Sequence, residues 1–322
     1  MGINEQLEQV KTIMHKELVT GDHYLNGSLN YVKETTGKLL RPRFLLIGAS
    51  FGKKTTKKQE HNLIRLAAAV ESLHVATLIH DDVIDESKLR RGQESIQSRY
   101  SKEYAIYMGD FILSRCFIML SQLDIKKELL VEIAKAMNQI CIGEMKQHKH
   151  RFNVHVNPLN YLRIVSRKTA TLFSISLSSG AYYAKAPEDT VKLLARIGHE
   201  IGMVFQLVDD LLDYEGSVIE VGKDLEKDML KGYYNIPVLF AMQGEKTPER
   251  QELKDLLEHS DGISKNKERI FELIKNLGGV EKTRELALRY NKRALALIEK
   301  LPEAPGKQAL IDLTANLIHR EK

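Results

Sequence analysis

Apolar residues recur every three to four positions along almost the whole chain, which is the spacing that places them on one face of an α-helix. The pattern is clearest in these segments: 61–85, 104–121, 126–147, 158–184, 188–214, 234–243 and 280–300. No segment shows a convincing alternation with the period of two that is typical of a half-buried strand. Most of the seven prolines lie near segment ends. The sequence therefore predicts an all-α protein whose helices pack as one large bundle.

No linker rich in Gly, Ser or Pro divides the 322 residues, so we expect a single domain over residues 1–322. The chain is 43% hydrophobic and 28% charged, as is typical of a globular protein with a sizeable core. The net charge of +5 is a mild excess that fits anionic small substrates or an anionic membrane surface. We find no concentrated basic face and no nucleic-acid-binding motif, so no nucleic acid partner is expected.

Several features predict a soluble cytoplasmic protein. Cys116 and Cys141 lie in apolar helical segments, and we expect both to be buried thiols in a reducing compartment. The start, MGINEQLEQVKTIMHKEL, is amphipathic and lacks the apolar core of a signal peptide. No charge-free run reaches the ~18 residues that a membrane-spanning helix needs.

Two copies of the motif D-D-x-x-D end two of the apolar segments. They are LIHDDVIDE at 78–86 and LVDDLLDYE at 207–215. Spacings of three or four place the following residues on one stripe of the first helix: Leu63, Ala67, Val70, His74, Thr77, Asp81 and Asp85. The second stripe contains Gly198, Gly202, Phe205 or Gln206, Asp209 and Asp213. We expect the aspartates to point into the bundle from two helices that face each other, with the two glycines beside a cavity or a close-packed neighbour.

Carboxylates four residues apart on a helix have Cβ atoms about 5–6 Å apart, and they repel strongly when they are buried without partners. A cation must therefore lie between them. Magnesium prefers oxygen ligands and commonly shares them with substrate phosphates. A single acidic cluster is more often a solvated helix face, whereas two copies on inward stripes favour a metal site.

Basic residues accompany the acidic motifs. R-R-G follows the first motif, T-G-K-L-L-R-P spans 36–42, S-R-K-T-A spans 166–170, and Lys223 follows the second motif. Each of these on its own is typical of a surface charge. Together with metal-type carboxylates they indicate a site for two diphosphates.

These motifs resemble, in content and order, those of the trans-isoprenyl diphosphate synthases, also called polyprenyl synthases. The chain also carries that family's G-K-x-x-R-P, E-x-x-H, G-D, G-E-x-x-Q and K-T signatures. It resembles in particular the catalytic component of long-chain hexaprenyl and heptaprenyl diphosphate synthases. The resemblance implies an all-α fold around a central cavity and a Mg²⁺-dependent condensation of isopentenyl diphosphate with an allylic diphosphate such as farnesyl diphosphate.

The resemblance also assigns roles to individual residues. The catalytic aspartates would be Asp81, Asp82, Asp85, Asp209, Asp210 and Asp213. The metal ligands among them would be Asp81, Asp82, Asp85, Asp209 and Asp213. Contacts to the allylic diphosphate would come from Arg90, Lys168 and Lys223, with Thr169 and Gln206 nearby. The isopentenyl diphosphate would be bound by Lys38, Arg41, His74 and Arg91.

Product length is expected to depend on the residues just before the first motif. Ala76 and Thr77 are small where short-chain members of the family carry an aromatic residue, and Met137 is expected to act as a deeper barrier. Both small residues favour a long all-trans product, as for a quinone side chain, over the alternative of a geranylgeranyl product.

The sequence departs from the family pattern in two places. Thr36 and Leu39 alter the first basic motif, and Tyr233 and Asn235 replace a lysine and a threonine in GYYNIP at 232–237. These departures favour weaker activity alone, or a synthase that needs a small non-catalytic subunit in a heterodimer; the other expectation is a homodimer. Membrane contact is expected to be at most peripheral, through the lipid product.

Other functions explain fewer of the residues. A terpene cyclase should carry N-D-x-x-S-x-x-x-E as its second motif, and a phosphohydrolase using H-D-D at 80–82 would leave 209–213 unexplained. A regulatory subunit commonly loses the aspartates that are all present here.

Overall fold

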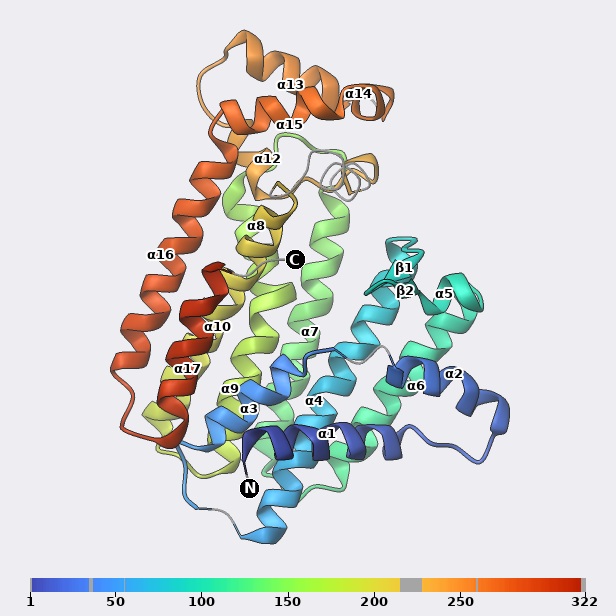
Figure 1. Ribbon diagram of the computed structural model, residues 1–322, viewed down its shortest axis with the longest axis vertical. Helices are drawn as coiled ribbons and strands as arrows, with labels where there is room; N and C mark the ends of the chain where they lie inside the picture. Colours follow the sequence, from blue (N-terminus) through green and yellow to red (C-terminus); the bar gives the residue numbers. More distant parts are fainter. Residues whose placement is uncertain (1, 35–36, 55, 215–227, 259, 320–322) are drawn as a thin grey trace. The chain divides into compact units, whose positions relative to one another are not determined.

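The computed structural model describes residues 2–34, 37–54, 56–214, 228–258 and 260–319. Within these ranges the chain is helical almost throughout, apart from one short two-stranded sheet (Figure 1). The all-α prediction is therefore confirmed. In chain order the elements are α1 (Ile3–Glu17), α2 (His23–Glu34), α3 (Leu40–Ala49), α4 (Lys57–Ile84), β1 (Leu89–Arg90), β2 (Gln93–Glu94), α5 (Ile96–Arg99), α6 (Lys102–Ser121), α7 (Lys127–Lys149), α8 (Pro158–Val165), η1 (Ser166–Ala170), α9 (Thr171–Tyr183), α10 (Glu188–Leu212), α12 (Ile236–Ala241), α13 (Pro248–Glu258), α14 (Ser260–Lys265), α15 (Lys267–Asn276), α16 (Gly279–Glu299), α17 (Pro305–Asn316) and η2 (Leu317–His319).

The chain forms two compact units. The first comprises Met1–Glu132, Ser176–Lys192 and Glu303–Gly306, and the second comprises Ile133–Ile175, Leu193–Pro302 and Lys307–Lys322. The first aspartate motif belongs to the first unit, and the second motif belongs to the second unit.

Helix α4 is the central element of the first unit. It begins with a capping box in which Thr56 and Gln59 bond each other's backbone N–H groups. It packs against α1, α3 and α6, and its residues 66–69 have no exposed surface. A Cβ atom added at Gly109 of α6 would lie 2.3 Å from Nε2 of His80, so this glycine permits close packing of the two helices. Helix α4 is thus held by neighbours up to the aspartate motif at its C-terminal end.

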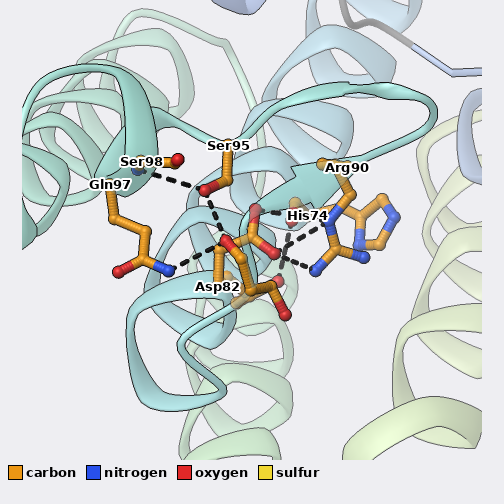
Figure 2. A network of polar contacts seen from close by, with 8 residues as sticks. His74, Asp82, Arg90, Ser95, Gln97 and Ser98 are labelled. Atoms are coloured by element: carbon orange, nitrogen blue, oxygen red, sulfur yellow. Dashed lines mark hydrogen bonds and ion pairs between the residues drawn. The ribbon is translucent and has the colours of Figure 1, made fainter. Parts of the chain in front are cut away.

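A small hairpin follows α4, and the sequence pattern did not predict it. Strands β1 and β2 pair antiparallel, and the two turn residues Arg91 and Gly92 have φ values of 53° and 78°. Positive φ at both positions is typical of a type I′ turn, which suits the twist of a two-residue hairpin. The Ser87 carbonyl accepts hydrogen bonds from Ser95 and Gln97, which ties the hairpin to α5 (Figure 2). Strands of two residues are too short to show a period of two.

In the second unit, the predicted helical segment 158–184 is interrupted. Helix α8 begins at Pro158, and the Asn157 side chain caps it by accepting a hydrogen bond from the Leu159 N–H at 2.8 Å. The chain then makes a π-helical turn, η1, before continuing as α9. Such turns often occur at functional sites, and this one carries Lys168 and Thr169.

The two glycines of α10 lie against a close-packed neighbour. A Cβ atom added at Gly198 would lie 2.6 Å from the carbonyl oxygen of Phe173, and one added at Gly202 would lie 2.5 Å from Cα of Ala170. Close packing between α10 and the η1–α9 segment therefore explains both positions. It also fixes the π-helical turn relative to the helix that ends in the second aspartate motif.

Two helices, α4 and α6, are long and apolar enough to cross a membrane by length and composition alone, with 72% and 39% of their most apolar windows buried. Core helices of soluble proteins pass the same test, and α4 packs as a core helix. The prediction of two buried thiols is half correct. Cys116 is buried, whereas Cys141, on α7, is exposed.

Candidate active site

The first aspartate motif ends α4 with one buried and two half-exposed carboxylates. Asp82 is 4% exposed, and the guanidinium of Arg90 donates to it, with Nε 3.0 Å from Oδ1 (Figure 2). Asp81 and Asp85 keep part of their surface exposed. That Asp81 and Asp85 point into the bundle stays a prediction. Asp82 is the buried aspartate of the motif, and it is also the one that Arg90 of the hairpin contacts. A buried carboxylate requires such a partner.

Glu71 and His74 lie on α4, two to three turns before the motif, and they interact with Arg41 and Arg91 from other segments. Glu71 is 2% and His74 8% exposed. Burial raises the pKa of Glu71, while the charges of Arg41 and Arg91 oppose that shift. Burial, followed by the charges of Arg41, Arg91 and Arg90, lowers the pKa of His74 well below its usual value. His74 is therefore a neutral imidazole at neutral pH, and the arginines carry the positive charge.

The segment before α3 adds to this cluster. A Cβ atom at Gly37 would lie 2.4 Å from a terminal nitrogen of Arg91, so the backbone at 37 lies directly against that guanidinium. Lys38 is exposed, and Leu39 precedes α3 with a φ of 50°. Three of the four predicted isopentenyl-site residues, Arg41, His74 and Arg91, are thus in electrostatic contact, with Lys38 beside them in sequence. Glu71 was part of a recognised signature, but sequence analysis gave it no role.

The second aspartate motif ends α10 and has a different internal arrangement. Asp210 is 5% exposed, and it accepts hydrogen bonds from the Tyr161 hydroxyl at 2.6 Å and from the Gln206 amide at 3.0 Å. Burial raises the pKa of Asp210 to about 8, although both hydrogen bonds favour its ionised form. Asp209 is exposed and Asp213 half-exposed. The inward direction of Asp209 and Asp213 likewise stays a prediction, and the neighbouring Asp210 is the buried aspartate.

Lys168 and Thr169 lie in the π-helical turn, and each is hydrogen-bonded to side chains of the second unit. The Lys168 ammonium is 2.9 Å from Oε2 of Glu144 and 2.9 Å from Oε1 of Gln147. The Thr169 hydroxyl donates to Oε1 of Gln206 at 2.9 Å. Thr169 and Gln206, both predicted to lie near the allylic diphosphate, contact each other, and their nearness to a diphosphate stays a prediction. Glu144 and Gln147 of the G-E-x-x-Q signature thus hold Lys168 of the K-T signature. The sequence alone did not predict this contact, because the two signatures lie far apart in the chain.

Two departures from the family pattern have structural partners. Asn235 accepts from the Tyr214 hydroxyl at 2.9 Å and donates to Oδ2 of Asp213 at 3.4 Å, so it contacts the aspartate motif. The Tyr233 ring lies 5.2 Å from the guanidinium of Arg151, measured to the ring centroid. A cation therefore packs on the aromatic ring where the family has a lysine. The predicted diphosphate contact Lys223 lies outside the described residues.

The residues predicted to set product length have different surroundings. Ala76 is 1% exposed and belongs to a hydrophobic cluster with Ala105 and Met108 of α6. Thr77 is half-buried, and its hydroxyl donates to the His74 carbonyl at 2.8 Å. Met137 on α7 is half-buried. Thr77 therefore keeps a partly exposed surface, whereas Ala76 is packed against a neighbouring helix.

The exposed carboxylates suit a hard divalent cation. Asp81, Asp85, Asp209 and Asp213 offer carboxylate oxygens and keep exposed surface. Among the described residues, no three His, Cys, Asp or Glu side chains are grouped to hold a metal by themselves. Magnesium sites commonly use one or two carboxylates and complete their shell with water and substrate phosphates. The donor set therefore fits magnesium that arrives with a phosphorylated substrate.

Comparison with known proteins agrees with this chemistry. The family model described as polyprenyl synthetase matches residues 22–274. The chain is 33% identical to heptaprenyl diphosphate synthase component 2 of Geobacillus stearothermophilus, over 99% of this chain and 97% of that protein.

Two solved structures are similar over nearly their whole length. A heptaprenyl diphosphate synthase from Staphylococcus aureus has a TM-score of 0.90 at 30% identity, covering 100% of this chain and 99% of that one. A geranylgeranyl pyrophosphate synthase from Lactobacillus brevis ATCC 367 has a TM-score of 0.91 at 31% identity, covering 99% and 97%. With the family model matched over most of its length, this chain belongs to the polyprenyl synthetase family.

Proposed function

We propose that this chain, acting as one synthase domain over residues 1–322, condenses isopentenyl diphosphate with an allylic diphosphate to give a long all-trans polyprenyl diphosphate. The observation that carries the proposal is the paired construction of the two aspartate motifs. Each ends a long helix, and each has one buried aspartate held by a protein partner and neighbours that keep exposed oxygens. Family membership makes the chain a trans-prenyltransferase, and these motifs are the part of it that suits metal–diphosphate chemistry.

Magnesium is the cofactor of this proposal. Asp81, Asp82 and Asp85 would hold it at the first motif, and Asp209 and Asp213 would hold it at the second. When bound, it would stabilise the negative charge on the departing diphosphate. Arg90 and Lys168 would add cationic contacts to the same diphosphate. Arg90 is bonded to Asp82 and Lys168 to Glu144, so an acidic side chain holds each cation in place.

The isopentenyl diphosphate would be bound without metal by the cluster of Lys38, Arg41, His74 and Arg91. The arginines supply fixed positive charge, and the neutral imidazole of His74 can donate one hydrogen bond. Glu71 limits the repulsion between the two arginines, since it lies buried within their field. Fixed charges in a buried cluster act more strongly than in water and need no reorganisation during the reaction.

A long product is favoured over a geranylgeranyl product by the small side chains before the first motif. The partly exposed Thr77 lies one turn before Asp81, on the helix face that also carries His74. No bulky side chain at 76 or 77 would stop a growing chain there. The solved structures include both long-chain and geranylgeranyl synthases, so the shorter product is the second candidate. A quinone side chain is the expected destination of the long product.

A second subunit is the second part of the proposal. The Geobacillus stearothermophilus relative is named as a component of its synthase, which favours a small non-catalytic partner for this chain over a homodimer. Helix α6 presents a set of exposed apolar side chains that such a partner would cover: Ile106, Tyr107, Phe117 and Ile118. We also propose a cytoplasmic location, with membrane contact only through the lipid product.

The proposal is tested by incubating the purified chain with labelled isopentenyl diphosphate, farnesyl diphosphate and Mg²⁺, with and without a candidate small subunit. The dephosphorylated alcohols are then sized by mass spectrometry. Long polyprenols that require Mg²⁺ support the proposal. Geranylgeraniol as the end product favours the second candidate, and cyclic hydrocarbons would reject both.

A further inference from the structure

The buried hydroxyl of Tyr161 has no role in the mechanism described so far. Tyr161 lies on α8, is 9% exposed, and donates to Oδ2 of Asp210 at 2.6 Å. The other oxygen of Asp210, Oδ1, accepts from the Gln206 amide at 3.0 Å, and Oε1 of Gln206 accepts from Thr169. A continuous chain of hydrogen bonds therefore joins α8, the C-terminal part of α10 and the π-helical turn.

This network fixes the direction in which the second motif presents its oxygens. Successive residues on a helix point about 100° apart, so a rotation that turns Asp210 inward turns Asp209 outward. Asp209 is the exposed member of the motif, and Asp213, one turn later, is half-exposed. Both oxygens of Asp210 are occupied by protein donors and are not directed to a ligand.

The partners of Asp210 are also electrically neutral. Tyrosine and glutamine satisfy the carboxylate with hydrogen bonds and bring no positive charge of their own. These two donors therefore bring no positive charge to the motif. A lysine or arginine in the place of Tyr161 would hold Asp210 equally well but would oppose metal binding.

We propose that Tyr161 is a positioning residue, which anchors Asp210 through its hydroxyl so that Asp209 and Asp213 present their oxygens to a magnesium diphosphate. The role rests on the proposed function, because it presumes that the second motif binds such a complex. Tyr161 touches neither metal nor substrate in this role and acts only through Asp210.

Tyr161→Phe tests the role because it removes one hydroxyl and keeps the ring. Tyr234→Phe is the matched control: Tyr234 is 8% exposed in the same unit, and its hydroxyl donates at 2.9 Å to the Leu257 carbonyl. Each variant loses one buried hydrogen bond, but only Tyr161 contacts a carboxylate of the motif. The direct readout is the Mg²⁺ concentration that gives a half-maximal thermal shift with inorganic diphosphate, and turnover is measured alongside.

We expect Tyr161→Phe to raise that Mg²⁺ concentration about fivefold to tenfold, the effect of losing roughly one buried hydrogen bond. Tyr234→Phe should leave it unchanged, although both variants melt at a lower temperature than the wild type without metal. Turnover of Tyr161→Phe at low Mg²⁺ should fall by the same factor and recover as Mg²⁺ is raised, with an unchanged KM for isopentenyl diphosphate. In an Asp210→Asn background, Tyr161→Phe should have little further effect.

Equal Mg²⁺ dependence in Tyr161→Phe and Tyr234→Phe would overturn the assignment and leave Tyr161 a structural residue. A change in KM for isopentenyl diphosphate with unchanged Mg²⁺ dependence would also overturn it. If the wild type binds magnesium diphosphate but makes no prenyl product, the proposed function fails, and the thermal-shift titration still decides the role of Tyr161.

Discussion

The two aspartate motifs share one sequence pattern and one place at the end of a long helix, yet the protein stabilises them by different means. In the first, the buried Asp82 is paired with the cation of Arg90. In the second, the buried Asp210 is held by the neutral donors Tyr161 and Gln206. The buried aspartate of the first motif thus has a cationic partner, whereas the donors to the buried aspartate of the second motif are neutral. Identical short motifs can therefore be stabilised by partners of different charge.

The largest expected effect comes from removing a solvent-facing aspartate in either motif. Asp81→Ala and Asp209→Ala should each lower turnover by about 10³-fold or more, because each removes a ligand of the ion that stabilises the leaving diphosphate. Thermal melting without metal should be unchanged or higher, since a repulsive charge is lost. Steady-state kinetics in Mg²⁺ provide the measurement, and near-normal activity of either variant would contradict the metal-binding model.

The cluster of Arg41, His74 and Arg91 near the first motif gives a second test. Arg41→Ala should raise the KM for isopentenyl diphosphate by about 10- to 100-fold, the loss of one charge-assisted contact. The KM for the allylic substrate should change much less. Arg163→Ala is a suitable control, since that arginine is exposed on α8. An equal rise in both KM values after Arg41→Ala would argue against two separate diphosphate sites.

The length of the product tests the residues just before the first motif and Met137 on α7. Thr77→Phe adds an aromatic ring at a half-buried position and should shorten the main product by several isoprene units, as seen by mass analysis of the alcohols. Ala76, the residue before Thr77, is packed in the core, so Ala76→Tyr should lower the free energy of unfolding. Overpacking a filled core typically costs about 1–3 kcal/mol. Met137→Ala should lengthen the product. An unchanged product in a folded Thr77→Phe variant would place the growing chain elsewhere.

The pairing of Asp82 with Arg90 can be tested by stability. Arg90→Ala leaves a buried carboxylate without its cation and should lower the free energy of unfolding by about 1–3 kcal/mol. Arg90→Ala combined with Asp82→Ala should recover part of that loss. The exposed pair of Lys102 and Glu86 is the control, and Lys102→Ala should cost less than about 1 kcal/mol in urea unfolding.

The smallest effect concerns pH. The pKa of His74 is lowered well below 6.5 in the folded protein, so the unfolded chain binds more protons as the pH falls through 6.5. The free energy of unfolding should therefore fall by up to about 1 kcal/mol per pH unit below that value. His74→Gln should lose this part of the pH dependence, while His61→Gln, at an exposed position of the same helix, should keep it. Identical pH profiles for His74→Gln and the wild type would mean that His74 is not neutral by burial.

Helix content and motif identity were predictable from the sequence because both depend on local order. Apolar residues spaced three to four positions apart predicted α4 and α10, and the two D-D-x-x-D motifs lie at the ends of these helices as predicted. The hairpin that carries Arg90 and Arg91 was not predictable, since its strands are two residues long. The π-helical turn at Lys168 was missed because one extra residue shifts the phase of the apolar pattern, while the helical period continues on both sides of it.

The sequence alone determined which residue types this protein uses: paired carboxylates, arginines and a lysine–threonine pair, each in a helical pattern. Only the tertiary structure decided which aspartate of each pair is buried. Helical spacing defines a face, but it does not say which neighbour covers that face. That choice depends on residues far away in the chain, such as Tyr161 for Asp210, because the cost of burying a carboxylate is met only where a folded neighbour brings a donor to it.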